Sequence, residues 1–350
     1  MDRTTITHIG RRLGLWLTLG LMVGCSEQTA MPSTTPPTFA VAASAITVTD
    51  LGTLPGGTSS GAQGINDRGQ VVGGSSGPGF SEHAVLWDHG VVTDLGTLPG
   101  GTFSGALGIN NRGQVVGLSD GPGSGAVIWD HGTVTDLGTF PGGFPNASGH
   151  GINDRGQVVG FGEDACCGDP HALLWDRGTV TDLGTLAGAT VSRASGINEP
   201  GQVVGIGARG AVLWDHGVVT DLGTLPAGTF SEARGINNQG QVVGVSDGPG
   251  FSFHAVLWDH GAVTDLGTLP GGTFSSAGAI NNQGQVVGVS DGPGFSFHAV
   301  LWDHGAVTDL GTLPGGTFSV AVAINDRGEV VGNGNGPGFT HAILWSISGR

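Results

Sequence analysis

The chain has 350 residues, of which 70 are Gly and none is Tyr, and all 12 of its basic residues are Arg. Glycine costs a helix interior about 1 kcal/mol relative to alanine, so a Gly-rich sequence that also recurrently carries Val, Thr, Leu, Ile and Trp excludes a helical bundle and favours short strands joined by tight turns. The formal net charge of −16 argues against a nucleic-acid ligand, because an acidic surface repels phosphate.

Residues 1–24 have the pattern of a signal peptide. An apolar run covers residues 13–24, follows Arg11 and Arg12, and is too short to span about 30 Å of hydrocarbon. The tetrapeptide Met22-Val23-Gly24-Cys25 resembles a bacterial lipoprotein box, which implies a lipid on the thiol of Cys25. The alternative is an ordinary signal peptide with an incidental cysteine.

Residues 25–45 hold the lipidated cysteine and a Ser/Thr/Pro-rich stretch without periodicity, which is typical of a flexible tether. We therefore expect the folded region to cover residues 46–350 and the protein to be anchored outside the cytoplasm, on the cell envelope, through its lipid alone.

Seven copies of one unit follow the tether. A Trp preceded by Leu or Ile occurs once in each copy, and residues 236–275 are identical to residues 280–319. The tetrapeptide Asp-Leu-Gly-Thr occurs seven times, beginning at Asp50, Asp94, Asp136, Asp182, Asp221, Asp265 and Asp309.

Each unit predicts four short strands. Ala-x-Gly-Ile-Asn is followed by a turn that ends in Gly, then by Gln-Val-Val-Gly, His-Ala-Val-Leu-Trp-Asp, a His-Gly turn and Val-Thr-Asp-Leu-Gly-Thr. Four strands in about 40–45 residues match one blade of a β-propeller.

The ends of the folded region predict how the ring closes. The region opens with a lone fourth strand near Ile46 and ends after a third strand near Trp345, so the first strand completes the last blade. We therefore predict an all-β fold, a seven-bladed β-propeller in one domain, with an open β-solenoid as the alternative.

These motifs resemble the HAF extracellular repeat family of bacterial proteins, which is named for a His-Ala-Phe triplet. The triplet reads His-Ala-Val at His83, His254 and His298, His-Ala-Leu at His171 and His-Ala-Ile at His341. The resemblance covers residues 46–350. It implies an extracellular or envelope protein and brings no catalytic residues with it.

The repeated polar and aromatic residues have structural interpretations. We expect the seven Trp to pack between blades rather than to stack on carbohydrate. We expect the Asp of each Asp-Leu-Gly to cap a turn, with calcium binding as the alternative, and the His of each His-Ala pair to be partly buried.

One insertion breaks the repeat in the third unit, where Cys166 and Cys167 are adjacent. In an oxidising compartment they are candidates for a vicinal disulfide. A zinc site that adds His171 and an acid, or two free thiols, are the alternatives.

Phenylalanines in the long loops are the candidate binding residues. In a propeller both kinds of long loop lie on the same face, so exposed rings would form one hydrophobic recognition surface, whereas tucked rings would only cover the blade ends. The candidates are Phe80, Phe103, Phe230, Phe251, Phe274, Phe295 and Phe318.

The sequence thus predicts a non-enzymatic, monomeric binding module without a cofactor or metal, whose partner is an envelope glycan or protein. No asymmetric set of nucleophile, base and orienting acid stands out among the repeats. A structural surface spacer and a propeller hydrolase or lyase are the alternative functions.

Overall fold

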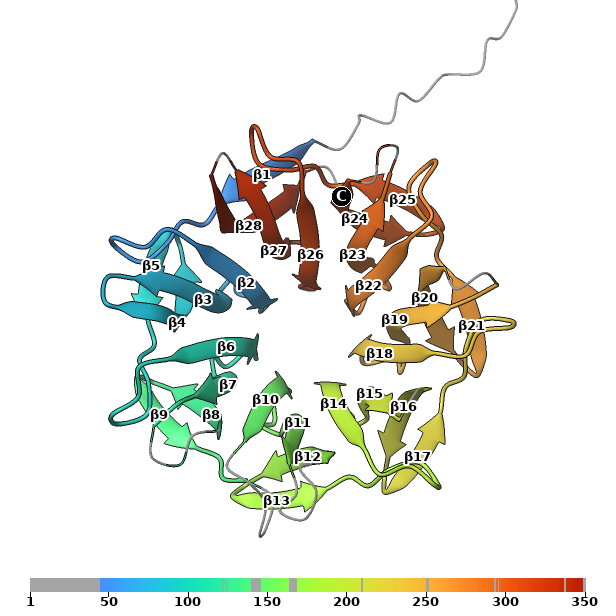
Figure 1. Ribbon diagram of the computed structural model, residues 1–350, viewed down its shortest axis with the longest axis horizontal. Helices are drawn as coiled ribbons and strands as arrows, with labels where there is room; N and C mark the ends of the chain where they lie inside the picture. Colours follow the sequence, from blue (N-terminus) through green and yellow to red (C-terminus); the bar gives the residue numbers. More distant parts are fainter. Residues whose placement is uncertain are drawn as a thin grey trace, which may run out of the picture. The chain divides into compact units, whose positions relative to one another are not determined.

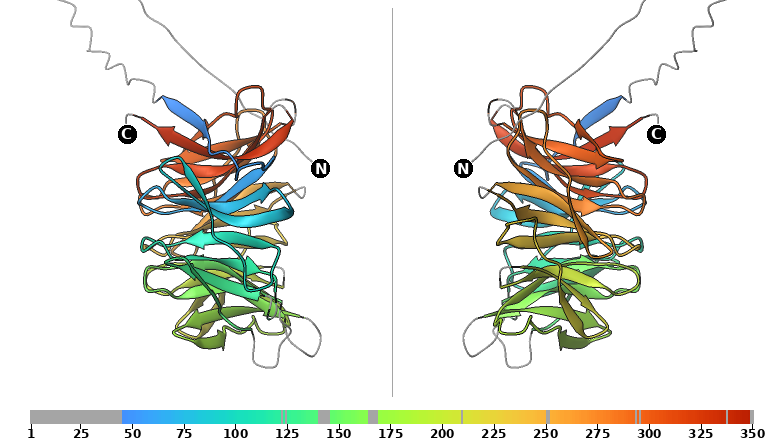
Figure 2. Two further views of the ribbon diagram at one scale, coloured as in Figure 1. Left: turned by 90° about the vertical axis from the view of Figure 1, so that its left-hand side faces the viewer. Right: turned by 90° about the vertical axis from the view of Figure 1, so that its right-hand side faces the viewer.

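The computed structural model describes residues 45–348, except for residues 122, 124, 140–145, 164–168, 209, 250–251, 293, 295 and 337. Its strands form seven four-stranded antiparallel sheets arranged as blades around a central channel (Figure 1). Seen edge-on, the ring has turns and loops on both of its faces (Figure 2). The prediction of a seven-bladed β-propeller is confirmed.

The four strands of a blade follow the predicted motifs from the channel outward. The innermost strands are β2 (Ser60–Ile65), β6 (Ser104–Ile109), β10 (Ala147–Ile152), β14 (Ser192–Ile197), β18 (Ser231–Ile236), β22 (Ser275–Ile280) and β26 (Ser319–Ile324). The second strands are β3 (Val71–Gly77), β7 (Val115–Ser119), β11 (Val158–Glu163), β15 (Val203–Gly207), β19 (Val242–Asp247), β23 (Val286–Asp291) and β27 (Val330–Gly336).

The outer half of each blade contains the Trp and Asp-Leu-Gly motifs. The third strands are β4 (Phe80–Asp88), β8 (Gly125–Asp130), β12 (Pro170–Asp176), β16 (Gly210–Asp215), β20 (Phe253–Asp259), β24 (Phe297–Asp303) and β28 (Phe339–Ile347). The outermost strands are β5 (Val91–Asp94), β9 (Thr133–Asp136), β13 (Thr179–Asp182), β17 (Val218–Asp221), β21 (Ala262–Asp265), β25 (Ala306–Asp309) and β1 (Ile46–Asp50).

The first strand closes the ring as predicted. β1 pairs antiparallel with β28, from Ile46 opposite Ile347 to Asp50 opposite Ile343, so blade 7 combines the two ends of the folded region. We number the blades from blade 1 (β2–β5) to blade 7 (β26–β28 with β1). This pairing ties the last blade to both ends of the chain and removes two unpaired strand edges.

Antiparallel pairing gives the ring two different faces. Both tight turns of a blade lie on one side, which we call the turn face, and both long connections lie on the other, the loop face. In blade 5 the tight turns require left-handed backbone at Gly240, with φ 81°, and at His260 and Gly261, with φ 49° and 81°. These are the conformations for which the sequence supplies Gly and His-Gly.

The hydrophobic core consists of seven clusters, each containing residues from neighbouring blades. Every propeller Trp is at most 3% exposed, which confirms the packing role. In six blades the indole N–H donates to the carbonyl of an Asp-Leu-Gly glycine, as Trp258 does to Gly223 at 3.2 Å. The indole N–H of Trp345 has no such partner among the described residues.

The requirement for Gly in each Val-Val-Gly motif has a steric cause, which the sequence motif alone did not reveal. The innermost strand of every blade has a register shift next to this Gly, between Ala233 and Gly235 in blade 5. The shift brings a carbonyl so close that a Cβ on Gly244 would lie 2.0 Å from the Glu232 oxygen. No side chain fits there, so the position requires Gly in every blade.

Over the part of the chain that the structure describes, no helix is long and apolar enough to span a membrane.

Candidate functional site

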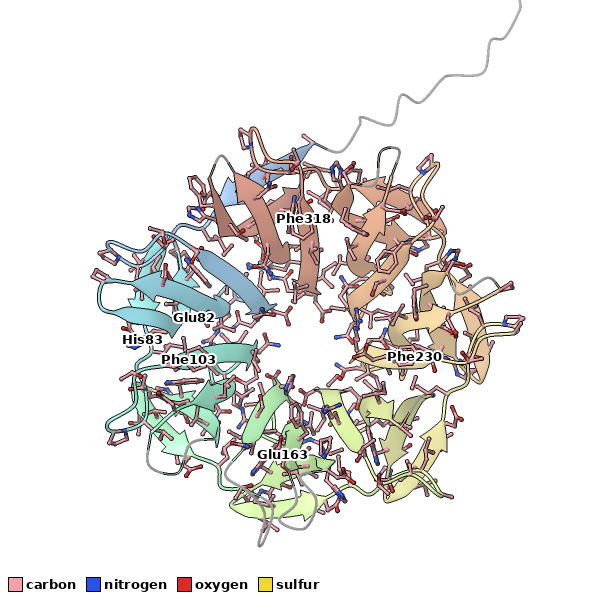
Figure 3. All side chains as sticks on the ribbon, viewed as in Figure 1. Glu82, His83, Phe103, Glu163, Phe230 and Phe318 are labelled. Atoms are coloured by element: carbon pink, nitrogen blue, oxygen red, sulfur yellow. The ribbon has the colours of Figure 1, made fainter. Side chains whose placement is uncertain are left out.

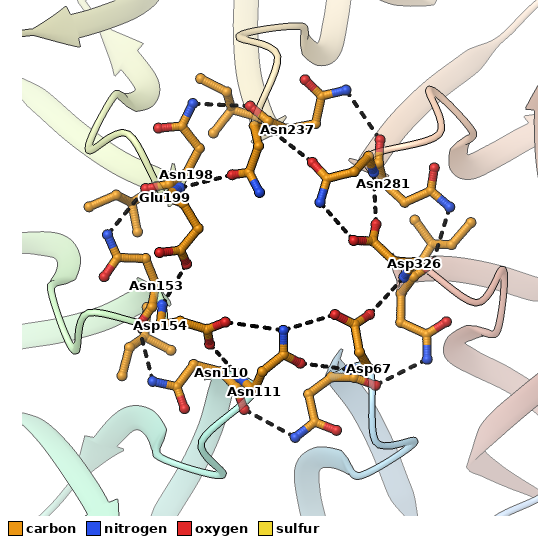
Figure 4. A pocket seen from close by; sticks show the side chains of 18 of the residues that line it. Asp67, Asn110, Asn111, Asn153, Asp154, Asn198, Glu199, Asn237, Asn281 and Asp326 are labelled. Carbon is orange, nitrogen blue, oxygen red and sulfur yellow. Dashed lines mark hydrogen bonds between the residues drawn. The ribbon is translucent and has the colours of Figure 1, made fainter.

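A closed ring of seven asparagines surrounds the channel on the turn face (Figure 4). Each side chain is 3–4% exposed and donates from Nδ2 to the backbone carbonyl of the equivalent asparagine in the next blade, at 3.0–3.2 Å. The members of this asparagine ring are Asn66, Asn110, Asn153, Asn198, Asn237, Asn281 and Asn325.

A second ring lies beside the first and contains the next residue of each blade. Its side-chain oxygens each accept the backbone N–H of the equivalent residue in the preceding blade, at 2.6–2.9 Å. Its members are Asp67, Asn111, Asp154, Glu199, Asn238, Asn282 and Asp326. Both rings enclose about 240 Å³, and their internal bonds connect each blade to the next around the whole channel.

The Asp of Asp-Leu-Gly caps a turn, as predicted. In blade 5 the Asp265 Oδ1 accepts the backbone N–H of Gly267 at 2.8 Å, while Oδ2 contacts the ring of His254 at 2.7 Å. The same His–Asp pair occurs in five blades, each with a partly buried His. Both oxygens of this Asp are therefore engaged by protein groups. Among the described residues, no three His, Cys, Asp or Glu side chains form a candidate metal-binding group.

In six blades an Asp follows the Trp and accepts the side-chain amide of a Gln, as Asp259 does from Gln241 at 3.2 Å. The His that follows it points into solvent, with 90% of the His260 side chain exposed. These repeated residues stabilise turns and carry no asymmetric chemistry.

The loop phenylalanines are mostly tucked against their own blades. Phe103, Phe230 and Phe274 are half-buried, and Phe318 is 36% exposed. Phe230 and Phe274 each make an edge-on contact with a second phenylalanine, Phe253 and Phe297, at centroid distances of 5.9 and 5.4 Å. The side chains of Phe80, Phe251 and Phe295 lie outside the described part of the structure, as do Cys25, Cys166 and Cys167.

A carboxylate fixes the loops that carry Phe103, Phe230 and Phe274, and Asn335 has the same position beside Phe318. Asp247 Oδ1 accepts the backbone N–H groups of Thr229 and Phe230 at 2.6 and 2.7 Å, and Oδ2 accepts the Thr229 hydroxyl. Burial acts to raise the pKa of Asp247, but these hydrogen bonds outweigh it and hold the pKa below its ordinary value. Asp291 has the same arrangement in blade 6.

A pocket of about 670 Å³ lies over blade 1 on the loop face, and we call it the blade 1 pocket. Phe103 borders it from blade 2 and Phe318 from blade 7, while Glu82 lies between them on β4 (Figure 3). Gln63, Asn333 and the serines of blade 1 supply further polar groups. A cavity of this size with few polar groups and aromatic walls has the character of a ligand site.

The blade 1 pocket exists because blade 1 departs from the repeat. Gly74 occupies a position where blades 2 to 6 carry Leu118, Phe161, Ile206, Val245 and Val289. Ser59 similarly stands where blades 2, 5, 6 and 7 carry a Phe, and Glu82 stands where blades 5 and 6 carry Phe253 and Phe297. Blade 1 thus loses bulk at two positions and gains a carboxyl group at a third.

On the blade 7 side, Asn333 replaces the apolar residue of the repeat and its Oδ1 accepts the backbone N–H of Ala62 at 2.9 Å. Gly74, Glu82 and Asn333 were missed by motif-based reasoning. Superposing the seven units and looking for positions where one unit departs from the others would have found them.

The channel wall contains a second group of residues outside the repeat. Arg193 lies over the ring of Phe161, with its Cζ atom 5.2 Å from the centroid, and His150 packs against the same ring. Burial and the charge of Arg193 lower the pKa of His150. Arg234 is already engaged, by Glu232 at 3.0 Å and the Ser276 hydroxyl at 2.6 Å.

No family model matches the chain, and no curated protein matches it. Among solved structures, the β-propeller domain of the Trilobed protease from Pyrococcus furiosus is similar over 83% of this chain and 96% of its own, at 10% identity and a TM-score of 0.55. A prolyl endopeptidase is similar over 84% of this chain and 51% of its own, at 11% identity and a TM-score of 0.57.

Pyrococcus horikoshii acylaminoacyl peptidase is similar over 83% of this chain and 52% of its own, at 12% identity and a TM-score of 0.50. The chain thus spans about half the length of the last two enzymes. At these identities the similarity shows the propeller fold alone.

Proposed function

We propose that the protein is a non-enzymatic binding module that holds its ligand in the blade 1 pocket. The observation that carries this proposal is the loss of bulk at Gly74 and Ser59, which opens a cavity over one blade of an otherwise repetitive ring. The blade 1 pocket is also larger than the pocket of about 270 Å³ that Phe103, Leu118 and Phe161 line on the same face. Glu82 gives the cavity a polar group with which to orient a ligand.

The chemistry of the blade 1 pocket favours binding over catalysis. Glu82 is the one titratable group among the described residues that line it. Hydrolysis by a serine or by a pair of carboxylates needs a base or a second acid within hydrogen-bond reach. The serines of the pocket have no His beside them in that lining.

The proposal includes the predicted location of the protein on the cell envelope. A lipid on Cys25 and a tether would hold the propeller on the outer side of an envelope membrane, where an envelope glycan or protein would reach the pocket. Membership of the HAF extracellular repeat family, which the recurring motifs suggest, and a monomeric state belong to the same proposal.

A ligand screen on the full chain tests the function. Thermal unfolding is followed with peptidoglycan fragments, envelope sugars, amines and calcium, using the wild type, Gly74→Val and Val289→Ile. Gly74→Val introduces the residue that blades 5 and 6 carry and displaces the Glu82 carboxyl group within the pocket, whereas Val289→Ile adds a methyl group at the same position in blade 6. A ligand at a hundredfold excess over its Kd stabilises the folded state by about 2.7 kcal/mol.

We expect at least one ligand to raise the unfolding midpoint of the wild type and of Val289→Ile but not of Gly74→Val. An equal shift in all three proteins would place binding outside the blade 1 pocket and refute the proposal. If no ligand raised the unfolding midpoint of the wild type, the structural spacer would be favoured.

A further inference from the structure

The charge of the blade 1 pocket is unbalanced. Its described lining contains the Glu82 carboxyl group and no Arg, Lys or His. Glu82 makes no hydrogen bond or ion pair with any described residue, although the rest of the pocket lining includes several amides and hydroxyls. The described lining thus supplies no counter-ion inside this cavity.

The position of Glu82 follows from the missing side chain at Gly74. A Cβ on Gly74 would lie 2.0 Å from Glu82 Oε1 and 2.7 Å from its Cδ. The carboxyl group therefore lies across the β3 backbone, in the space that an apolar side chain fills in blades 2 to 6. Gly74 and Glu82 are complementary departures from the repeat, and together they place one carboxyl group inside the pocket.

Two phenyl rings lie with Glu82 among the residues that would contact a ligand in the pocket. Phe103 and Phe318 come from the blades on either side of blade 1, and both line the pocket. Phenyl faces attract organic cations through their quadrupole, and a carboxylate attracts the same cations through its charge. A single carboxyl group, aromatic walls and no competing cation are complementary to an ammonium group attached to an apolar body.

We propose that the blade 1 pocket binds an organic ammonium ligand, with Glu82 as its counter-ion and the rings of Phe103 and Phe318 against its apolar part. This inference rests on the proposed function, since it names the ligand class of the same pocket. An anionic ligand would meet only a like charge here. A neutral polyol would leave the carboxylate in the cavity without an opposite charge.

The titration of Glu82 supports the proposal. Glu82 is exposed as a residue, but partial desolvation of its carboxyl group raises its pKa, because desolvation favours the neutral acid. A bound ammonium group favours the carboxylate instead, so its affinity should rise as the pH rises through the pKa of Glu82. Other titratable groups on or beside the surrounding strands are the pairs His83–Asp94 and His341–Asp50, Asp88 at the end of β4, and Asp120 after β7, which accepts the backbone N–H of Phe103.

A matched pair of probes tests the ligand class. Phenethylamine and 2-phenylethanol have nearly the same shape and differ in charge. Calorimetric titrations of both into the full chain compare the wild type, Glu82→Gln, Gly74→Val and Val289→Ile, at several pH values for the first two. We expect the wild type and Val289→Ile to bind the amine about tenfold more tightly than the alcohol.

Glu82→Gln should abolish this preference and the pH dependence that goes with it while the alcohol still binds, and Gly74→Val should lose both probes. A wild type that binds both probes equally, or neither, would overturn the inference. So would a preference for the amine that survives in Glu82→Gln.

The two proposals fail in different ways. If Gly74→Val loses a ligand of the wider panel that Glu82→Gln retains, the blade 1 pocket is a binding site and only its ammonium specificity is wrong. If the amine binds equally well to Gly74→Val, the pocket itself is not the site.

Discussion

The two faces of the propeller are built from the same seven repeats, but they use them differently. On the turn face every blade contributes the same Asn, and the seven side chains close a ring of hydrogen bonds. On the loop face the blades contribute different residues, and Gly74 and Glu82 of blade 1 line the blade 1 pocket. The repeated residues of the turn face close the ring of blades. The residues that depart from the repeat on the loop face form the candidate binding site.

This contrast shows where to look for function in a repeat protein. A residue present in all seven units, such as Asn237, donates to the equivalent carbonyl in every blade and stabilises the ring. A residue present in only one unit has neighbours that occur once. Glu82 is such a residue, and it lines the blade 1 pocket.

Breaking the asparagine ring should have the largest effect on stability. Asn237→Ala removes Nδ2 bonds to the Gln241 side chain and the Asn281 carbonyl, and leaves the backbone N–H groups of Gln239 and Gln241 without their acceptor. Because the Asn237 side chain is buried and the groups it serves are buried or partly buried, we expect a loss of about 2–4 kcal/mol in the free energy of unfolding. Urea denaturation of the full chain measures it.

Gln239→Ala is the control in the same turn, because the Gln239 side chain is exposed and blades 1, 2, 3 and 7 carry Arg there. It should change the free energy of unfolding by less than about 0.5 kcal/mol. If Asn237→Ala were as mild as this control, the ring would contribute nothing to stability, and the contrast between the faces would disappear.

A change at the Gly shared by all blades should have the next largest effect. Gly244→Ala places a Cβ 2.0 Å from the Glu232 carbonyl oxygen, and a backbone atom cannot rotate away as a side chain does. We expect the strained blade to lower the free energy of unfolding by about 1–3 kcal/mol.

Gly105→Ala separates this clash from a general intolerance of side chains, because its Cβ would meet only Leu118, at an ordinary 3.6 Å. Urea denaturation should show little change for Gly105→Ala. Equal losses in the two variants would mean that the close carbonyl is not the reason for Gly in Val-Val-Gly.

Most of the fold was predictable from the sequence because it depends on local features that recur. Positive φ at Gly240 and His260 follows from the residue types at the turns, and the pairing of β1 with β28 follows from the phase of the repeats at the two ends. Seven copies of each signal reinforce one another. The buried Trp and the capping Asp were predictable for the same reason.

The pocket and the rings were not predictable in this way because they depend on contacts between blades. The Nδ2 group of Asn66 meets a carbonyl 44 residues away, and Asn333 meets the backbone of Ala62 across the closure. A motif shows that Asn recurs but not what it faces. Glu82 is an exposed residue near the start of β4, and its relation to the pocket becomes visible only when Gly74 is placed beneath its carboxyl group.

The smallest effect we predict concerns the loop face, where blades 5 and 7 anchor the equivalent Phe-bearing loop with different residues. Asp247 accepts the N–H groups of Thr229 and Phe230, and Asn335 accepts those of Thr317 and Phe318 at 2.9 and 2.8 Å. Asp247→Asn should therefore keep the loop in place and cost less than about 1 kcal/mol.

The pH dependence separates charge from geometry at this loop. The pKa of Asp247 is lowered in the folded protein, so its charge stabilises the fold above the ordinary pKa of an Asp, and this contribution is lost as the pH falls through the lowered value. The difference in unfolding free energy between the wild type and Asp247→Asn, measured by urea denaturation, should shrink as the pH is lowered from about 5 toward 3. A difference that stayed constant over this range would mean that the charge of Asp247 contributes nothing, and that the two blades anchor their loops by hydrogen-bond geometry alone.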